Sequence, residues 1–315
     1  MATIEVELDA EYRALREATG FLTRANRGLV SVTGPEAAEL LQGQLTNDVL
    51  ALEPGQGCYA ALLNRKGQMQ ADMRVLRLAA DELWLDAELD TVEAIVRHMQ
   101  MFGVGREAQA DDASADWVIV SVIGPGASEA AGVAVAGGEH AHHRLERDGF
   151  ALVAVATDTG IDLIAPAADA PAVTSSLVAA GAVEVSEAAA EIVRVESGRP
   201  RFGREMTAKT IPAEAHINER AVSFTKGCYI GQETVARLHY KGKPNRHLRG
   251  LRLEAPAQAG DPVRRGEREL GTIGTAVVSP AHGPVALAIL RREAGLGDAV
   301  TVGDDIGAEI VDPPF

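Results

Sequence analysis

A long β-hairpin between residues 57 and 78 is the feature that most limits the folds open to this chain. A strand is predicted over 57–63, a four-residue turn over Asn64–Gly67, and a second strand over 68–78. In the second strand, apolar residues alternate with polar ones, which predicts one buried and one exposed face. A further strand over 83–86 and a helix over 91–102 follow. Antiparallel strands followed by a helix favour the α+β class.

The chain length predicts more than one domain, because 315 residues exceed what a single core usually holds. A strand closed by Gly-Pro occurs twice, at 29–35 and at 117–125, which indicates two related halves. From Pro244 onward, short strands predicted at 248–253, 270–278, 285–290 and 299–302 are separated by Gly and Pro. That spacing predicts a C-terminal all-β barrel.

The net charge of −15 argues against nucleic acid and anionic membranes as partners, because the field of the protein repels both. Every apolar run is interrupted by acids or arginines, so no membrane span is predicted. The acidic residues 1–11 lack the basic segment and apolar core of a secretory signal. We therefore expect a cytoplasmic protein.

Only two cysteines are present, Cys58 and Cys228. This number argues against a disulfide scaffold, and two cysteines cannot supply the four thiolates of an iron–sulfur or zinc site within one chain. His140, His142 and His143 lie close together in the sequence, but no cysteine and few acids are near them. We predict no metal site.

The stretch 226–233, Lys-Gly-Cys-Tyr-Ile-Gly-Gln-Glu, has the composition of a binding loop. Its two glycines permit unusual backbone conformations and a close approach by another group. A helix is predicted directly after it, and the free N–H groups at a helix start favour acceptor-rich ligands. A plain tight turn is the alternative interpretation.

This stretch resembles the signature of the YgfZ family, folate-binding proteins linked to iron–sulfur cluster maintenance. Those proteins are relatives of the aminomethyltransferase (T-protein) of the glycine cleavage system, and the run over 41–49 is similar to both groups. The resemblance implies a three-domain, T-protein-like α+β cloverleaf. We expect residues 1–50 with 115–185, residues 51–114 with 186–243, and a barrel over 244–315.

The resemblance also implies tetrahydrofolate as the ligand. Arg194-x-Glu196-x-Gly198 is similar to the folate-site helix of the family, in which the glutamate holds the pterin ring. A carboxylate suits that role, because it can accept two N–H groups of the pterin edge at once. Gln232 is expected to complete the ring contacts. The remaining residues of the predicted folate set are Lys226, Gly227, Tyr229, Gly231, Glu233 and Asn64.

A basic segment follows the signature, since residues 234–253 contain no acid. Its cations suit the glutamate or polyglutamate tail of a folate, and the alternative is a solvated surface. Its cationic residues are Arg237, Lys241, Lys243, Arg246, Arg249 and Arg252.

The hairpin departs from the aminomethyltransferase pattern at one position. Relatives carry a paired Asp-Asp there, one of which is the catalytic acid–base group, whereas this chain has Ala71-Asp72. The missing carboxylate would have tuned the pKa of its neighbour, so the glycine-cleavage reaction is in doubt. Asp72 remains a candidate catalytic residue, with a solvated strand residue as the alternative.

Cys228 is the second candidate catalytic residue. Lys226 and the following helix start both favour the thiolate, and a small buried hydrophobe is the alternative. The leading hypothesis is a tetrahydrofolate-binding protein that supports assembly or repair of iron–sulfur enzymes, with those enzymes or assembly proteins as partners. A folate-dependent aminomethyl- or methyltransferase and a non-enzymatic docking scaffold remain as alternatives.

Overall fold

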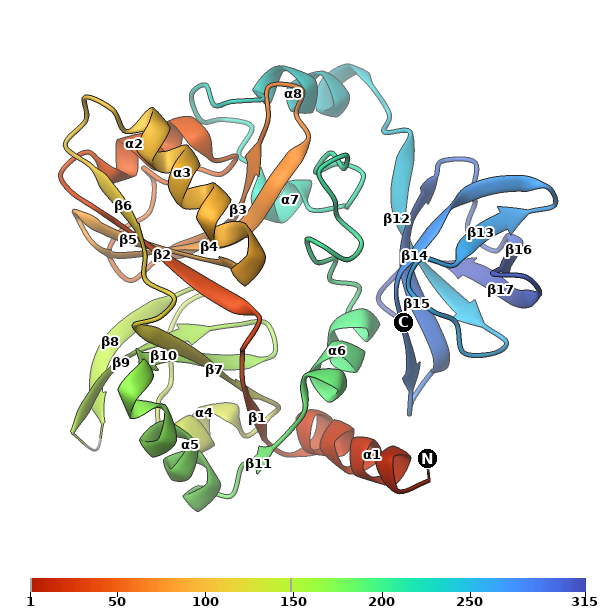
Figure 1. Ribbon diagram of the computed structural model, residues 1–315, viewed down its shortest axis with the longest axis horizontal. Coiled ribbons are helices and arrows are strands. Elements are labelled where there is room, and N and C mark those ends of the chain that lie inside the picture. Colours follow the sequence, from red (N-terminus) through yellow and green to blue (C-terminus); the bar gives the residue numbers. More distant parts are fainter. Residues whose placement is uncertain (1, 148) are drawn as a thin grey trace. The chain divides into compact units, whose positions relative to one another are not determined.

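The computed structural model describes residues 2–147 and 149–315 (Figure 1). The chain divides into two compact units. Unit 1 comprises residues 1–63, 70–187 and 220–230, and unit 2 comprises 64–69, 188–219 and 231–315. The chain therefore crosses repeatedly between the units. The three domains expected from the sequence, with their boundaries, stay a prediction.

Unit 1 contains two β-sheets. The five-stranded sheet has the order β3-β4-β5-β2-β6, and the six-stranded sheet has the order β11-β1-β7-β10-β9-β8. The strands of the first sheet are β2 (Arg27–Thr33), β3 (Gly57–Leu63), β4 (Met69–Ala79), β5 (Glu82–Glu88) and β6 (Gln109–Asp112). Those of the second are β1 (Gly20–Thr23), β7 (Trp117–Ile123), β8 (His142–Arg147), β9 (Phe150–Ala156), β10 (Gly160–Pro166) and β11 (Val183–Glu184).

The helices of unit 1 cover the outer faces of the two sheets. Contacts place α2 (Ala37–Gln44) and α3 (Val92–Phe102) on the five-stranded sheet, and α4 (Ala127–Ala131) and α5 (Ala170–Ala179) on the other. The N-terminal helix α1 (Ala2–Glu17) packs beside β1 and β11. Short 3-10 turns, Leu89–Thr91 and Ala167–Asp169, precede α3 and α5.

Successive side chains of each strand enter different cores, because they point to opposite faces of the sheet. Leu29 of β2 joins a cluster with Val153 and Ile164 of the second sheet, so the two sheets pack face to face. The next residue, Val30, joins the cluster under α2 and α3. The strand alternation predicted from the sequence is therefore confirmed, although part of the second face of β4, including Leu76, is buried between the sheets instead of exposed.

Unit 2 is built around a closed β-barrel with the strand order β12-β15-β14-β13-β16-β17 (Figure 1). Its strands are β12 (Arg246–Leu253), β13 (Pro262–Arg265), β14 (Arg268–Ser279), β15 (Gly283–Arg291), β16 (Ala299–Val302) and β17 (Ile306–Val311). The predicted barrel is confirmed, with β13 and β17 as strands that the sequence reading omitted. Leu251, Val263 and Leu290 lie in its core.

Between β11 and the barrel lie the helices α6 (Glu187–Glu196), α7 (Asn218–Ala221) and α8 (Gln232–Lys241). The α8 helix was predicted directly after the signature stretch, and it begins two residues earlier, at Gln232. The Ala/Gly-rich sequence of residues 126–141 predicts a loop, and this expectation is wrong in part, because Ala127–Ala131 form α4. Among the described residues, no helix has both the length and the apolar character needed to cross a membrane.

Candidate functional site

Glu196 of unit 2, the predicted pterin contact, lies at the last position of α6 and is only 2% exposed. Its Oε1 accepts a hydrogen bond of 2.5 Å from the hydroxyl of Ser279, at the end of β14. Its backbone oxygen accepts a 3.0 Å bond from the N–H of Phe315. A glutamate at a helix end is usually exposed, so the burial of this one marks it as a specifically held carboxylate.

Arg194 fixes α6 in place two residues before its end. Its guanidinium donates to Glu191 at 2.7 Å, to Glu205 at 3.0 Å and to the hydroxyl of Thr275 at 2.9 Å. Glu205 also accepts the N–H of Arg201 at 3.0 Å. The Arg-x-Glu pattern of the sequence therefore combines a partly buried anchoring arginine with the held glutamate.

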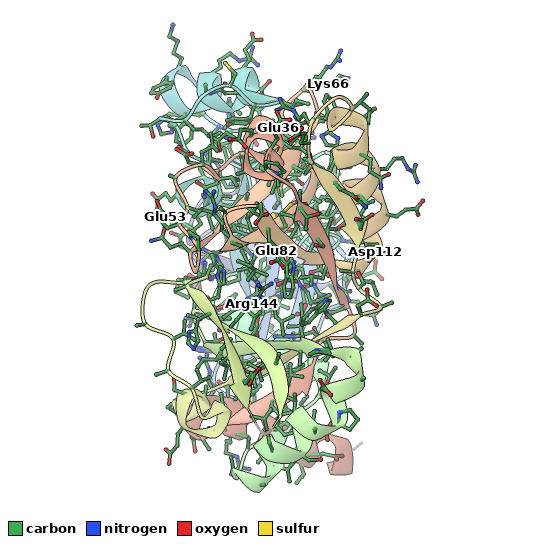
Figure 2. The ribbon with its side chains drawn as sticks, turned by 90° about the vertical axis from the view of Figure 1, so that its left-hand side faces the viewer. Glu36, Glu53, Lys66, Glu82, Asp112 and Arg144 are labelled. Atoms are coloured by element: carbon green, nitrogen blue, oxygen red, sulfur yellow. The ribbon has the colours of Figure 1, made fainter. Side chains whose placement is uncertain are left out.

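The tip of the β3–β4 hairpin and the start of α8 meet within unit 2. A Cβ placed on Gly67 would lie 2.8 Å from Cβ of Thr234, and Gly67 has a φ of +77°, so glycine is required there. Asn64 caps the turn: its Oδ1 accepts the N–H of Lys66 at 2.9 Å and that of Gln68 at 3.1 Å. Asn64 thus has a turn-forming role, while the side chain of Lys66 extends outward (Figure 2).

Gly231 occupies the N-cap of α8 with a φ of +85° and provides no side-chain cap. Gln232 and Glu233 form the first turn, with Gln232 half-buried and Glu233 exposed. The predicted loop leading into a helix start is confirmed. The first-turn N–H groups have no side-chain cap at this end, which is the arrangement that favours an acceptor.

A lysine in a binding loop such as 226–233 is expected to carry a strongly hydrated point charge, and this expectation is wrong for Lys226, which is buried at 8% exposure. Its Nζ donates to the carbonyl oxygens of Gln42, Leu45 and Asn47 at 2.7, 2.7 and 2.8 Å. These oxygens lie at and beyond the C-terminal end of α2, where a cation is favoured. Burial lowers the pKa of Lys226 to about 8. Its contacts give it an anchoring role for the signature stretch.

The two cysteines of unit 1 have different surroundings. Cys228 is exposed, so the buried-hydrophobe interpretation of this residue is wrong. Cys58 is largely enclosed, and burial raises its pKa to about 12. Next to Cys228, no atom lies within 4 Å of a Cβ built on Gly227, whereas Tyr229 is buried with the Lys226 ammonium 5.1 Å from its ring centroid.

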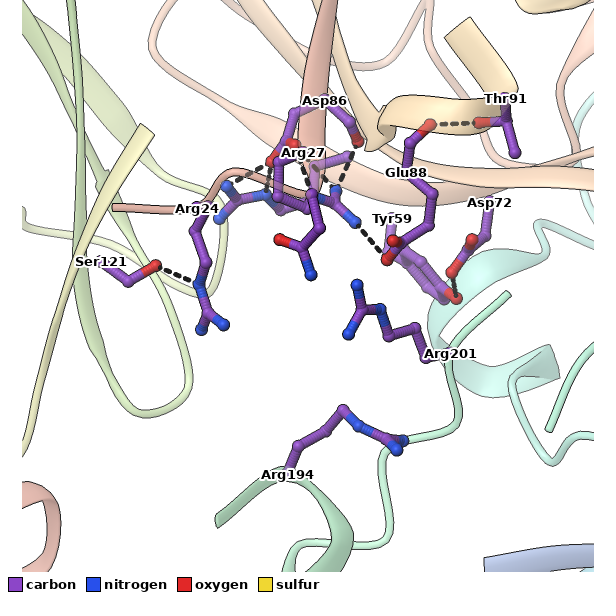
Figure 3. Close-up of polar contacts among 12 residues, drawn as sticks. Arg24, Arg27, Tyr59, Asp72, Asp86, Glu88, Thr91, Ser121, Arg194 and Arg201 are labelled. Atoms are coloured by element: carbon purple, nitrogen blue, oxygen red, sulfur yellow. Dashed lines mark hydrogen bonds and ion pairs between the residues drawn. The ribbon is translucent and has the colours of Figure 1, made fainter. Parts of the chain in front are cut away.

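Asp72 of unit 1 is buried at 8% exposure, which excludes the solvated interpretation of this residue. The hydroxyl of Tyr59 donates to its Oδ2 at 2.5 Å (Figure 3). Within residues 2–147 and 149–315, its other oxygen, Oδ1, is buried with no hydrogen-bond partner. Burial raises the pKa of Asp72, and the Tyr59 hydrogen bond and the Arg27 charge only partly offset this effect. Such a carboxyl can hold or release a proton.

Charged side chains of unit 1, Arg27 and Glu88 among them, lie near Asp72 (Figure 3). Arg27 donates to Asp86 at 2.8 Å and to Glu88 at 3.1 Å, and both of these acids are buried. The guanidinium of Arg220 lies 5.0 Å from the centroid of the Tyr59 ring. The sequence interpretation did not include Tyr59 or these arginines, because their partners are 13 to 161 positions away along the chain and no local motif marks them.

His140 lies next to this charged cluster. It is 6% exposed, its φ of +73° is unusual for a residue other than glycine, and its Nε2 lies 3.7 Å from Glu139. Burial, then the charges of Arg74 and Arg220, lower its pKa to about 3. No three His, Cys, Asp or Glu side chains in the described part of the chain converge as a metal site would require.

Comparisons with known proteins agree with this architecture. Residues 2–226 match the family model described as the GCVT N-terminal domain. An aminomethyltransferase of Saccharopolyspora erythraea is 28% identical, covering 97% of this chain and 89% of the relative. One of Rubrobacter xylanophilus is 27% identical, covering 98% and 86%. A putative chloroplastic transferase of Arabidopsis thaliana is 24% identical, covering 91% and 69%.

A solved structure shares the fold. The crystal structure of glycine cleavage system aminomethyltransferase T from Bartonella henselae superimposes with a TM-score of 0.87 at 23% identity. The match covers 98% of this chain and 89% of that one. The predicted T-protein-like α+β fold with a C-terminal barrel is therefore confirmed.

Proposed function

This chain belongs to the GCVT N-terminal domain family, and from that membership we propose that it is a tetrahydrofolate-binding protein that supports the assembly or repair of iron–sulfur enzymes. We place this role in the cytoplasm, with iron–sulfur enzymes or their assembly proteins as partners. The relatives named as aminomethyltransferases support a folate ligand, and the Lys-Gly-Cys-Tyr-x-Gly-Gln-Glu signature supports the YgfZ-type role.

The observation that carries the folate proposal is the buried carboxylate of Glu196, fixed by the Ser279 hydroxyl at 2.5 Å. A pterin has a row of N–H donors along its pyrimidine edge, and a carboxylate with a fixed orientation is the acceptor that this edge requires. Gln232, with both a donor and an acceptor, serves the remaining ring atoms. Bound tetrahydrofolate would supply an acceptor for one-carbon units.

The basic segment after the signature supports a ligand with an anionic tail. Arg237, Lys241 and Lys243 are exposed on and after α8, and none of them forms an ion pair with another residue of 2–147 or 149–315. In a protein with a net charge of −15, such unpaired cations concentrate positive potential beside Gln232. We therefore include polyglutamylated tetrahydrofolate among the ligands.

Replacing Glu196 with Gln tests the folate proposal. The amide offers one acceptor in place of two, so we expect tetrahydrofolate affinity to fall at least several-fold, corresponding to about 1–3 kcal/mol. Isothermal titration calorimetry measures the change. Glu219→Gln is the matched control, because Glu219 is exposed in the same unit. Equal affinities of the Glu196 variant and the unchanged protein would remove Glu196 from the site.

The iron–sulfur proposal makes Cys228 the reactive thiol, because it is exposed whereas Cys58 is enclosed and has a raised pKa. We expect Cys228 to be alkylated at neutral pH and Cys58 to be resistant. In cells, Cys228→Ala should lower the activity of iron–sulfur enzymes without changing folate affinity, and Cys58→Ala should not. Full cellular activity of Cys228→Ala would contradict a chemical role for this thiol.

A second candidate function is a folate-dependent aminomethyl- or methyltransferase. It is favoured by Asp72, whose burial, raised pKa and unpartnered Oδ1 suit a proton-transfer group. Ala71 beside it, in place of a second carboxylate, weighs against the glycine-cleavage reaction. Turnover of an aminomethyl-lipoyl donor by the purified protein, abolished in Asp72→Asn, would establish this alternative. The docking scaffold gains support only if Glu196→Gln retains full cellular activity.

A further inference from the structure

We propose that Ser279, at the β14–β15 turn of the barrel, is a positioning residue that sets the orientation of the Glu196 carboxylate for ligand binding. The inference rests on the proposed folate-binding function and adds a residue to it. Ser279 and Glu196 are 83 positions apart, and both are 2% exposed. The bond between their side chains therefore forms out of contact with bulk water, where an unmet hydrogen bond is costly.

The hydrogen-bond pattern of Ser279 fixes the direction of its single proton. Its Oγ accepts the backbone N–H of Ala281 at 3.0 Å and that of His282 at 2.9 Å. A hydroxyl has two acceptor lone pairs and one donor, so these bonds occupy its acceptor capacity. The donor is left for Glu196 Oε1, and a hydrogen bond from a hydroxyl to a carboxylate is charge-assisted and stronger than one between neutral groups.

The backbone at Glu196 is held from the same side of unit 2. The N–H of Phe315 donates to its carbonyl oxygen, and the Phe315 ring packs with Val195, Leu248 and Leu287. Two residues further on, Gly198 has a φ of +70°, and a Cβ built there would lie 2.6 Å from Cβ of Pro313. Main chain and side chain of Glu196 are thus both constrained by the barrel and by the segment that follows β17.

The consequence is that the barrel contributes to ligand recognition without supplying the recognising carboxylate. A glutamate side chain has three rotatable bonds, and fixing it before the ligand arrives removes part of the entropy cost of binding. Without the Ser279 proton, the carboxylate loses both a fixed orientation and a partner in a buried setting. Folate affinity then falls although the recognising residue is unchanged.

A double-mutant cycle tests this dependence on Glu196. We expect Ser279→Ala to weaken tetrahydrofolate binding about tenfold, measured by calorimetry. In a Glu196→Gln background, Ser279→Ala should lower the tetrahydrofolate affinity less than about twofold, because the effects of substitutions at coupled residues are not additive. Ser279→Thr keeps the hydroxyl and should restore most of the affinity. Thr272→Ala is the control, since Thr272 is exposed on the same strand.

Each outcome has a distinct meaning. If the unchanged protein binds no tetrahydrofolate, the proposed function fails, and this inference fails with it. If the losses of affinity caused by Ser279→Ala and Glu196→Gln are additive, only the positioning role is overturned. The same holds if the Ser279→Thr variant binds tetrahydrofolate as weakly as the Ser279→Ala variant. Should the alanine variant not fold, Ser279→Cys, whose thiol is a much weaker donor, gives the same comparison.

Discussion

At the scale of single residues, the structure buries three ionisable side chains that bear on the candidate site. They are Asp72, His140 and Lys226, with exposures of 8%, 6% and 8%. Burial acts on each in the direction of the neutral form: it raises the pKa of Asp72 and lowers the pKa values of His140 and Lys226. Only Lys226 has hydrogen-bond partners for all three of its donors. The other two each keep a buried polar atom without a partner in the described part of the chain.

The lowered pKa of the buried His140 imidazole predicts that the protein loses stability in mild acid. Its pKa is about 3 in the folded protein and about 6.5 in the unfolded chain, so between these values only the unfolded state binds the proton. The contribution of His140 to the free energy of unfolding is therefore complete above about pH 6.5, and it falls as the pH decreases toward 3. We expect a loss of about 2 kcal/mol between pH 6.5 and 4.5 from this residue, measured by urea unfolding at a series of pH values.

His140→Asn should flatten that part of the pH profile. Asparagine does not titrate and tolerates the left-handed conformation that His140 adopts at φ +73°. His143→Asn, at an exposed position nearby, should leave the profile unchanged. If both variants lose stability in acid as steeply as the unchanged protein, the buried imidazole is not the cause.

At the scale of elements, Lys226 joins the signature stretch to the end of α2. Lys226→Met would fill a similar volume but leave the carbonyl oxygens of Gln42, Leu45 and Asn47 without this donor. We expect the free energy of unfolding to fall by about 1–3 kcal/mol at pH 7. Lys241→Met, on the exposed end of α8, should change it by less than about 0.5 kcal/mol. Equal effects of the two substitutions would contradict the anchoring role.

Most elements could be predicted from local sequence patterns. The alternation of β4, the Gly-Pro boundaries before α2 and α4, and the helix start at α8 all depend on residues within a few positions of one another. The strands β13 and β17 were not predicted, because their four and six residues carry weak alternation and are defined by barrel pairing. Residues 127–131 were read as loop for a similar reason, since small alanines provide no amphipathic pattern.

The candidate site was predictable only where a motif marks it. The family pattern selected Glu196, and the structure shows it buried and held. The partners that hold it could not be predicted, because Ser279 and Phe315 lie in a different part of the sequence. For the same reason the exposure of Lys226 was predicted wrongly: its three acceptors come from residues about 180 positions earlier.

At the scale of the whole molecule, Arg74 links the two sheets of unit 1. Its guanidinium donates to Asp86 of β5 at 2.6 Å and to Asp162 of β10 at 2.6 Å. Asp86 is fully buried, and although burial opposes ionisation, Arg27 and Arg74 lower its pKa. We expect Arg74→Met to reduce the free energy of unfolding by about 3–5 kcal/mol, because it leaves buried carboxylates undercompensated.

Chemical denaturation at neutral pH measures this loss. Arg97→Met is the matched control, because Arg97 and its partner Glu93 are 73% and 86% exposed. An exposed pair contributes about 0–1 kcal/mol, so the control should unfold almost like the unchanged protein. A loss below about 1 kcal/mol for Arg74→Met would show that the sheets are held by their apolar cluster alone.

The repeated crossing of the chain between the two units has a consequence for biosynthesis. Unit 1 includes residues 220–230, and unit 2 includes residues 64–69, so neither unit is a continuous segment. Domains usually fold in the order in which the ribosome releases them. Here the first unit lacks its last segment until about three quarters of the protein has been translated. The hairpin tip at 64–69 belongs to unit 2, and the barrel of that unit is translated later still. The nascent chain therefore carries unfinished surfaces through most of its synthesis, and we expect neither unit to complete its core before these late segments are released.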